Sequence, residues 1–437
     1  MEKNINTVSN KQIASATFAS VMGWSLDLFD LFLILYVAPT VAGLFFPSKI
    51  QTLSLASVFA AFAVSVIVRP FGSAFFGNYA DKWGRKRSMI ITVAGVGIAT
   101  SSLGILPTFA SVGFIAPVLF LLIRILQGFF VGGVTASTHT IGTETVAAKW
   151  RGLMSGIITG GASIGALLAS FVLFIVNKIF PGPAFKIWGW RCMFFSGLLC
   201  IILAIVMYKV LDESPLWLEM KQKREEEPKN KQTKSPLKIL LSKKYASTMI
   251  INIMVVAGAS SIYYLTSGYL PTFLETINKI PASSSAKLLM LVSVIAFISP
   301  MLIGQLSQVI GRKKTFLITG IACLVIMPFL YIHLAQAHDV IGRVLLFTIL
   351  ISALGNAPYS PVLIFLNERF PTEIRASGTA VSWNVGFAIG GLMPTFVTAV
   401  SPTISQIPSR LVVFLIIMGL IFIIGSILSP ETKDNFN

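Results

Sequence analysis

The sequence is poor in charged residues, which make up 12% of its 437 residues, whereas hydrophobic residues make up 55%. A soluble globular chain carries about 25% charged residues, so this chain has too little polar surface to cover a folded core in water. The composition excludes collagen-like, coiled-coil and disordered chains. It predicts a polytopic membrane protein, whose apolar surface contacts the lipid bilayer.

Cysteine is also scarce, and its three copies lie far apart in apolar stretches, at Cys192, Cys200 and Cys323. This spacing suits neither a metal site nor a disulfide framework, so we expect packing residues and no metal or cofactor. The polar segments lack a metal triad, a nucleophile elbow and a phosphate-cradling loop, so we expect no enzyme. The ends outside the outermost spans, 1–13 and 429–437, are too short for the signalling domain of a receptor.

Acidic residues are half as frequent as basic ones, 17 against 34, which gives a net charge of +17. Such an excess could serve nucleic-acid binding, but its distribution favours another interpretation. If the N-terminus is cytoplasmic, inside segments hold about three times as many basic residues as outside segments, as the positive-inside rule requires. We therefore expect a multi-pass plasma-membrane protein with both termini in the cytoplasm and no nucleic-acid partner.

Twelve apolar stretches are long enough to cross a bilayer, because a helical span needs roughly 20 residues. They are predicted as helices, since backbone groups in lipid must bond within their own segment. The expected spans are 14–38, 53–77, 88–107, 113–137, 152–176, 190–209, 246–273, 285–307, 315–334, 343–366, 379–400 and 408–428. The charged stretch 212–245 divides them into an N-terminal six-helix bundle (1–211), a cytoplasmic linker (212–245) and a C-terminal six-helix bundle (246–437).

The two halves also repeat each other in sequence. "GNYADKWGRKR" at 77–87 matches "GQLSQVIGRKK" at 304–314, an offset of 227, with Gln308 where the first copy has an acid. Gly161 and Gly165 match Gly386 and Gly390 at an offset of 225. Residues four apart share a helix face, and small faces let membrane helices approach closely. The pattern predicts an all-α fold of two pseudo-symmetric bundles with the substrate at their interface.

At these motifs the chain resembles the major facilitator superfamily. The motif between spans 2 and 3 is matched by Gly77, Asp81, Lys82, Gly84, Arg85 and Lys86, and the span 4 motif by Arg124, Gln127, Gly128 and Gly132. "RPFGSAFFG" (69–77) and "ERFPTEIRASG" (368–378) resemble the metabolite:proton symporter branch. "GWSLDLFD" (23–30) is similar to sialate and monocarboxylate transporters. The resemblance implies the major facilitator fold and proton-coupled transport, and we expect a monomer.

Three ionisable residues lie near the predicted middle of the membrane. A charge is energetically costly there, so such residues usually have a function or pair with an opposite charge. Asp27 and Asp30 share a face of the first span, and Arg124 lies at the same depth in the fourth. A carboxylate that gains and loses an Arg partner can carry a proton, so we predict proton coupling, with Asp30 favoured as the carrier. The alternative is a permanent salt bridge between the two spans. Arg69 could reach the membrane–water interface, an anionic substrate or a neighbouring acid.

The second half holds almost no buried charge, and the position equivalent to Asp27 is Asn252. We infer that the first half couples protons and the second holds substrate, although each polar residue there could serve packing instead. The substrate-binding candidates are Arg69, Gln127, Asn252, Tyr263, Tyr264, Asn356, Tyr359, Trp383 and Asn384. For gating, the resemblance points to the loop with Gly77, Asp81, Lys82, Gly84, Arg85 and Lys86, and the spacing to the ion pairs Glu144–Arg151 and Glu368–Arg375.

The sequence therefore predicts a proton-coupled symporter that moves a small organic acid or similar polar metabolite by alternating access. A proton-independent facilitator of a sugar or metabolite is one alternative. A drug/proton antiporter is disfavoured, because such antiporters carry a Gly-Pro pair in span 5 and no proline lies between 152 and 176 here.

Overall fold

The computed structural model describes residues 10–83, 85–210, 240, 242–337, 340–371, 374–433 and 435. Within these residues ten segments are long and apolar enough to cross a membrane, and a shorter apolar helix lies at Gly342–Asn356. We assign two further crossings to α4 (Arg85–Leu103) and to the pair α17–α18 (Leu345–Asn356 and Val362–Glu368). The predicted linker 212–245 lies outside the described residues except at 240 and 242–245. The chain is thus a helical multi-pass membrane protein, as predicted.

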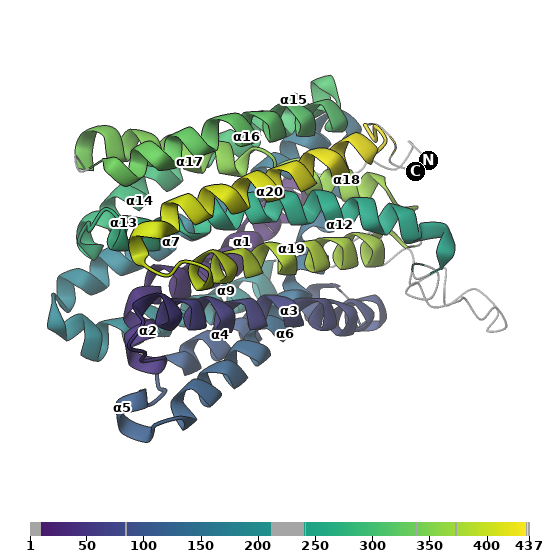
Figure 1. Cartoon of the computed structure of the whole chain (residues 1–437). Helices are drawn as coiled ribbons and strands as arrows, with labels where there is room; N and C mark the ends of the chain where they lie inside the picture. Colours follow the sequence, from purple (N-terminus) through teal and green to yellow (C-terminus); the bar gives the residue numbers. More distant parts are fainter. Residues whose placement is uncertain are drawn as a thin grey trace.

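The first half contains α1 (Asn10–Tyr36), α2 (Ala38–Phe45), α3 (Gln51–Trp83), α4 (Arg85–Leu103), α5 (Phe109–Val112), α6 (Ile115–Glu144), α7 (Arg151–Ile179), α8 (Trp190–Phe195) and α9 (Leu198–Val210). The second half contains α12 (Lys243–Tyr263), α13 (Leu270–Thr276), α14 (Ala282–Ala296), α15 (Ile298–Ile310), α16 (Arg312–Gln336), α17 (Leu345–Asn356), α18 (Val362–Glu368), α19 (Arg375–Ala399) and α20 (Ile407–Leu428). The long helices run roughly parallel, and α20 ends at the end of the bundle where α12 begins (Figure 1).

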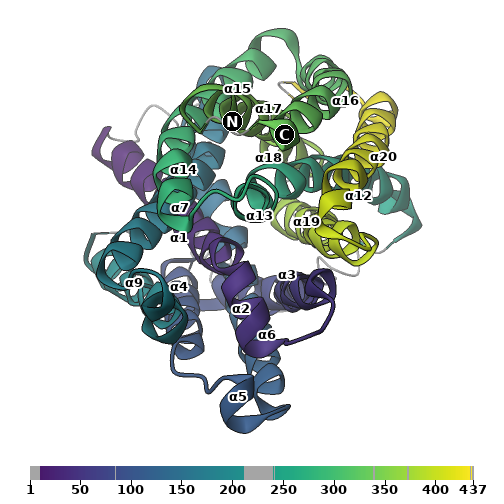
Figure 2. The same cartoon turned by 60° about the vertical axis from the view of Figure 1, so that its left-hand side comes forward.

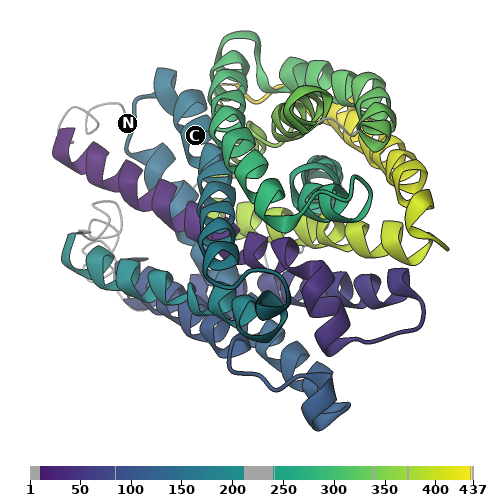
Figure 3. The same cartoon turned by 90° about the vertical axis from the view of Figure 1, so that its left-hand side faces the viewer.

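Two groups of helices lie side by side, one from each half of the sequence. Figure 2 shows the purple-to-blue helices on one side and the green-to-yellow helices on the other, with α1 and α7 between them. In Figure 3, α7 of the first half runs beside α14 of the second. Apolar side chains such as Phe114, Leu302 and Val325 are 78%, 65% and 67% exposed, and we assign these outer faces to lipid.

The repeated glycines make equivalent contacts in the two bundles. A Cβ on Gly165 of α7 would lie 2.4 Å from the carbonyl oxygen of Ser25 on α1. A Cβ on Gly390 of α19 would lie 2.3 Å from Oγ of Ser260 on α12. Each bundle therefore packs its fifth span against its first through a small face, which confirms the predicted pseudo-symmetry.

One expectation about continuity was wrong. The motif at 77–87 was expected as a loop, but α3 continues to Trp83 and α4 begins at Arg85, so most of the motif lies in the ends of two helices. The span predicted over 246–273 is confirmed within Lys243–Thr276, and it contains a π-helical turn, η4 (Tyr264–Gly268), between α12 and α13. Such turns occur often at functional sites, and similar turns, η3 (Phe185–Gly189) and η5 (Val340–Val344), precede α8 and α17.

A close approach of α3 and α6 makes a test of the fold. A Cβ on Gly128 would lie 2.0 Å from the carbonyl oxygen of Ser65, so Gly128→Ala must push the two backbones apart. We expect a loss of about 1–3 kcal/mol of stability or more, measured as a lower thermal unfolding midpoint in detergent. Gly43→Ala is the control, because nothing lies within 4 Å of its added Cβ. Equal midpoints for the two variants would contradict this packing.

A candidate transport site between the bundles

An ion pair joins the first and second spans inside the protein. Nη2 of Arg69 on α3 lies 3.3 Å from Oδ1 of Asp27 on α1, and both side chains are buried. Of the three roles the sequence left open for Arg69, the structure assigns contact with a neighbouring acid. Pro70 follows within the continuous helix α3 and cannot donate a backbone hydrogen bond there.

The second carboxylate is held by neutral donors. Asp30 accepts hydrogen bonds from Thr100 of α4 and from the amide of Gln127 on α6. The same amide nitrogen donates to Thr100 over 2.8 Å, and the amide oxygen of Gln127 accepts from Arg124, one turn earlier on α6. Arg124 was expected near one or both carboxylates. Gln127 bridges it to Asp30, and the two charges interact electrostatically.

We call Asp27, Asp30, Arg69 and Arg124 the charged cluster. All four are at most 3% exposed, and their formal charges sum to zero. Taking an isolated ion out of water costs several kcal/mol even after relaxation, unless a partner of opposite charge is near. The cluster can therefore exist inside the protein because its charges balance.

Aromatic rings cover the charged cluster from the second half. The guanidinium carbon of Arg69 lies 5.6 Å from the centroid of the Phe387 ring on α19, within the range of a cation–π contact. Phe387 stacks on Trp383 with centroids 5.1 Å apart, and Tyr263 stacks on Tyr359 at 4.9 Å. We call this group the aromatic cluster; it comprises Trp24, Tyr263, Tyr264, Tyr359, Trp383 and Phe387.

The predicted substrate-binding residues fall into different places. Tyr263, Tyr264, Tyr359 and Trp383 lie together in the aromatic cluster, and Arg69 and Gln127 belong to the network around the carboxylates. Asn384 donates to Oγ of Ser73 on α3 over 2.8 Å, so it bridges the two bundles. Asn252 accepts from Nε of Arg369 over 3.1 Å, and Asn356 lines a pocket between the bundles.

An ion pair also fastens the end of the second bundle at which α15, α18 and α20 terminate. Arg312 pairs with Glu368 at 2.9 Å and donates to Oε1 of Gln308 over 2.7 Å. Thr432 also donates to Glu368, over 2.8 Å. Burial raises the pKa of the Glu368 carboxyl, while its hydrogen bonds with Arg312 oppose that rise. Glu431 accepts from the backbone N–H of Arg312 over 2.8 Å. Neither Arg312 nor Glu431 was predicted as a site residue from the sequence.

Most of the other predicted gating residues have side chains outside the described part of the chain. The side chains of Asp81, Lys82, Arg85, Glu144 and Arg375, and all of Gly84, lie outside the described residues. Gly77 lies within α3, and Nζ of Lys86 lies 5.4 Å from the ring centroid of Tyr208. Arg151 begins α7. The two predicted ion pairs, Glu144–Arg151 and Glu368–Arg375, stay predictions.

The sequence reasoning missed several neighbours of the site, namely Trp24, Ser73, Thr100 and Phe387. Helical spacing could have found three of them, because each shares a face with a residue already singled out: Trp24 lies three residues before Asp27, Ser73 four after Arg69, and Phe387 three after Asn384. Thr100 carried no such signal, because a lone hydroxyl in a span usually bonds to its own helix.

The ion pair predicts a specific pattern of stabilities. Asp27→Asn leaves Arg69 without the partner it needs, and breaking a buried pair this way costs about 3–5 kcal/mol. The double variant Asp27→Asn/Arg69→Gln removes both charges and should regain most of that loss. The measurement is thermal unfolding of the purified proteins in detergent, treated as a double-mutant cycle. Losses that simply add would mean that the two groups do not interact.

The known proteins that this chain resembles are membrane transporters. The model of the Major Facilitator Superfamily matches residues 13–395. The glycine betaine/proline/ectoine/pipecolic acid transporter OusA of Dickeya dadantii is 27% identical over 399 residues, which cover 90% of this chain and 78% of that protein. The proline/betaine transporter of Escherichia coli K12 is 25% identical over 439 residues, covering 99% and 86%.

The fold is likewise that of a solved transporter. The proton:xylose symporter XylE bound to 6-bromo-6-deoxy-D-glucose superposes with a TM-score of 0.76 at 18% identity, over 96% of each chain. The names of these similar proteins do not reproduce the sialate and monocarboxylate likeness of the first span. The chain belongs to the Major Facilitator Superfamily, and it is a multi-pass membrane transporter of small solutes rather than an enzyme.

Proposed function

We propose that the protein is a proton-coupled symporter of a small zwitterionic solute, acting as a monomer in the plasma membrane with both termini in the cytoplasm. The observation that carries the proposal is the charged cluster: two buried carboxylates, one paired directly with Arg69 and the other linked to Arg124 through Gln127. The excess of basic residues in the segments assigned to the cytoplasm supports the orientation.

Proton coupling follows from what a buried carboxylate does when its surroundings change. A nearby cation stabilises the ionised form, whereas burial without a cation favours the protonated form. Asp30 has only neutral direct donors, Thr100 and Gln127. A displacement of Arg124 would remove the stronger of its two cationic neighbours and leave only Arg69, which is paired directly with Asp27. We assign Asp30 as the proton carrier and Asp27, with its direct ion pair, as the group that holds Arg69.

The aromatic cluster favours a substrate that carries a cationic group. A zwitterion brings one without adding net charge, and its carboxylate can face the net positive charge that the charged cluster carries once Asp30 is protonated. Its ammonium group can lie against the aromatic cluster, since aromatic faces bind quaternary ammonium groups. The proline and betaine transport named for the similar proteins agrees with this class.

Symport of one proton with a zwitterion moves one net charge. At 100 mV this supplies about 2.3 kcal/mol, which sustains roughly a fortyfold concentration ratio. A facilitator without proton coupling would instead stop at equal concentrations and ignore the pH gradient.

The test is uptake of radiolabelled proline and glycine betaine by vesicles containing the purified protein, with the interior alkaline and negative. We expect accumulation that collapses when a protonophore is added. Uptake that is unaffected by the protonophore would support the facilitator instead, and accumulation of labelled acids but of neither zwitterion would reject the substrate class.

Asp30→Asn tests the proton carrier. The amide keeps an oxygen that Thr100 and Gln127 can bond but cannot carry a proton, so gradient-driven accumulation should be lost while exchange of internal for external solute continues. Glu275→Gln, an acid-to-amide change on α13 outside the charged cluster, is the matched control and should keep accumulating. Accumulation by Asp30→Asn at the unaltered level would contradict the assignment.

A further inference from the structure

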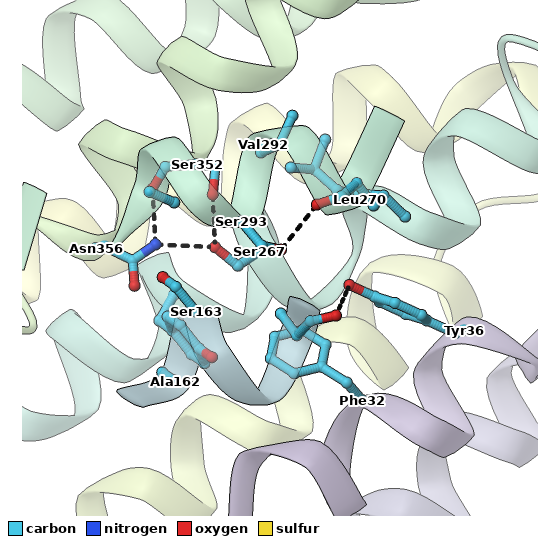
Figure 4. Close-up of a pocket in the computed structure, with 14 residues that line it drawn as sticks. Phe32, Tyr36, Ala162, Ser163, Ser267, Leu270, Val292, Ser293, Ser352 and Asn356 are labelled. Atoms are coloured by element: carbon cyan, nitrogen blue, oxygen red, sulfur yellow. Dashed lines mark hydrogen bonds between the residues drawn. The ribbon is translucent and has the colours of Figure 1, made fainter. Parts of the chain in front are cut away.

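A pocket lies between the two bundles, lined by fourteen residues (Figure 4). Phe32 of α1 and Ser163 of α7 line it from the first half, and Tyr263, Ser267 and Asn356 line it from the second. None of the fourteen side chains is charged. The pocket is therefore separate from the charged cluster, and its chemistry is that of neutral hydrogen-bonding groups.

The amide of Asn356 has a fixed orientation. Its Nδ2 donates to the carbonyl oxygen of Ser352 over 2.8 Å and to Oγ of Ser267 over 3.2 Å; Figure 4 shows this hydrogen-bonded group on one wall of the pocket. A carbonyl oxygen can only accept, so the atom facing Ser352 is the NH₂ group. The other amide atom, Oδ1, is buried and has no hydrogen-bond partner.

A second buried polar atom on the same pocket also lacks a partner. Tyr263 is 1% exposed, and its hydroxyl makes no hydrogen bond. Buried groups left unsatisfied are costly, and native proteins pair nearly all of them. Two residues that line the pocket thus carry an unused acceptor, Oδ1 of Asn356, and an unused donor, the hydroxyl of Tyr263.

We propose that this pocket binds a neutral substituent of the substrate that both donates and accepts a hydrogen bond, such as a hydroxyl group, and that Asn356 and Tyr263 select for it. A methylene satisfies neither atom. A carboxylate would set a second acceptor against Oδ1 and bring a charge where no cation lines the wall. A hydroxyl donates to Asn356 and accepts from Tyr263 without adding charge.

The position of Tyr263 lets one solute use both regions. Its ring stacks on Tyr359 in the aromatic cluster at 4.9 Å and meets Phe32 on the pocket wall at 6.4 Å. A small zwitterion whose ammonium lies against the rings can place a hydroxyl two or three bonds away in the pocket. This inference rests on the proposed function, because it assumes a zwitterionic substrate at the aromatic cluster.

The experiment compares two probes that differ by one hydroxyl group, carnitine and γ-butyrobetaine, as unlabelled competitors of labelled glycine betaine uptake into vesicles. We expect the unaltered protein to bind carnitine about tenfold more tightly, with about threefold from each of the two hydrogen bonds to otherwise unpaired buried atoms. Asn356→Leu, of similar size without an acceptor, and Tyr263→Phe, which keeps the ring, should each lower the ratio of the two inhibition constants to about threefold. Because the readout is a ratio, a loss of affinity shared by both probes does not change it.

Asn177→Leu is the matched control, because Asn177 of α7 bonds within its own helix, to the carbonyl oxygen of Leu173 over 2.9 Å, and does not line the pocket. It should keep the tenfold ratio. A ratio near one in the unaltered protein, or a ratio that survives both pocket variants, would overturn the inference while leaving the proposed symport intact. If Asn356→Leu does not fold, Tyr263→Phe decides alone. Absence of gradient-driven glycine betaine uptake would instead reject the proposed function and this inference with it.

Discussion

The need to balance charge away from water determines how the first bundle is assembled. Asp27 and Asp30 lie on α1, Arg69 on α3 and Arg124 on α6, and each side chain is almost fully buried. Because an isolated ion is costly in such surroundings, the three helices must place these groups close together. The direct pair between Asp27 and Arg69 and the link through Gln127 both depend on that proximity.

Glycines in the fourth span make this proximity sterically feasible. A Cβ on Gly132 would lie 2.1 Å from the carbonyl oxygen of Arg69 itself, and Gly128 stands equally close to α3 one turn earlier. The helix that carries Arg124 can therefore lie against the helix that carries Arg69 only because these positions lack side chains. The glycines and the cations of this motif have one explanation: small residues bring the backbones together, and the charges then find partners across the seam.

The sequence predicted the depth of each ionisable residue in the membrane and the helix face on which it lies, but not which side chains it would contact. The span predicted over 53–77 corresponds to α3 (Gln51–Trp83), and the shared depth of Asp27 and Arg124 followed from their positions within their spans. Helical spacing does not say how one helix is rotated against its neighbours, so it could not tell that Gln127 would separate Arg124 from Asp30. Nor did helical spacing show that Arg69 would reach Asp27. Arg69 lies about 6 Å from the middle of its predicted span, toward the cytoplasm, and its long side chain covers that distance.

The division into a proton-coupling half and a substrate-binding half is less strict than the sequence suggested. Arg69 belongs to the first bundle, yet its guanidinium lies over Phe387 of the second, and one turn along each helix Asn384 donates to Ser73 across the same seam. A movement that separates α3 from α19 would remove the aromatic face from Arg69 and break that hydrogen bond together. Since Arg69 is also the partner of Asp27, a change at the bundle interface alters the surroundings of a buried carboxylate directly. In the proposed symport, Arg69 would therefore link the movement of the two bundles to the charged cluster without a long chain of intermediate contacts.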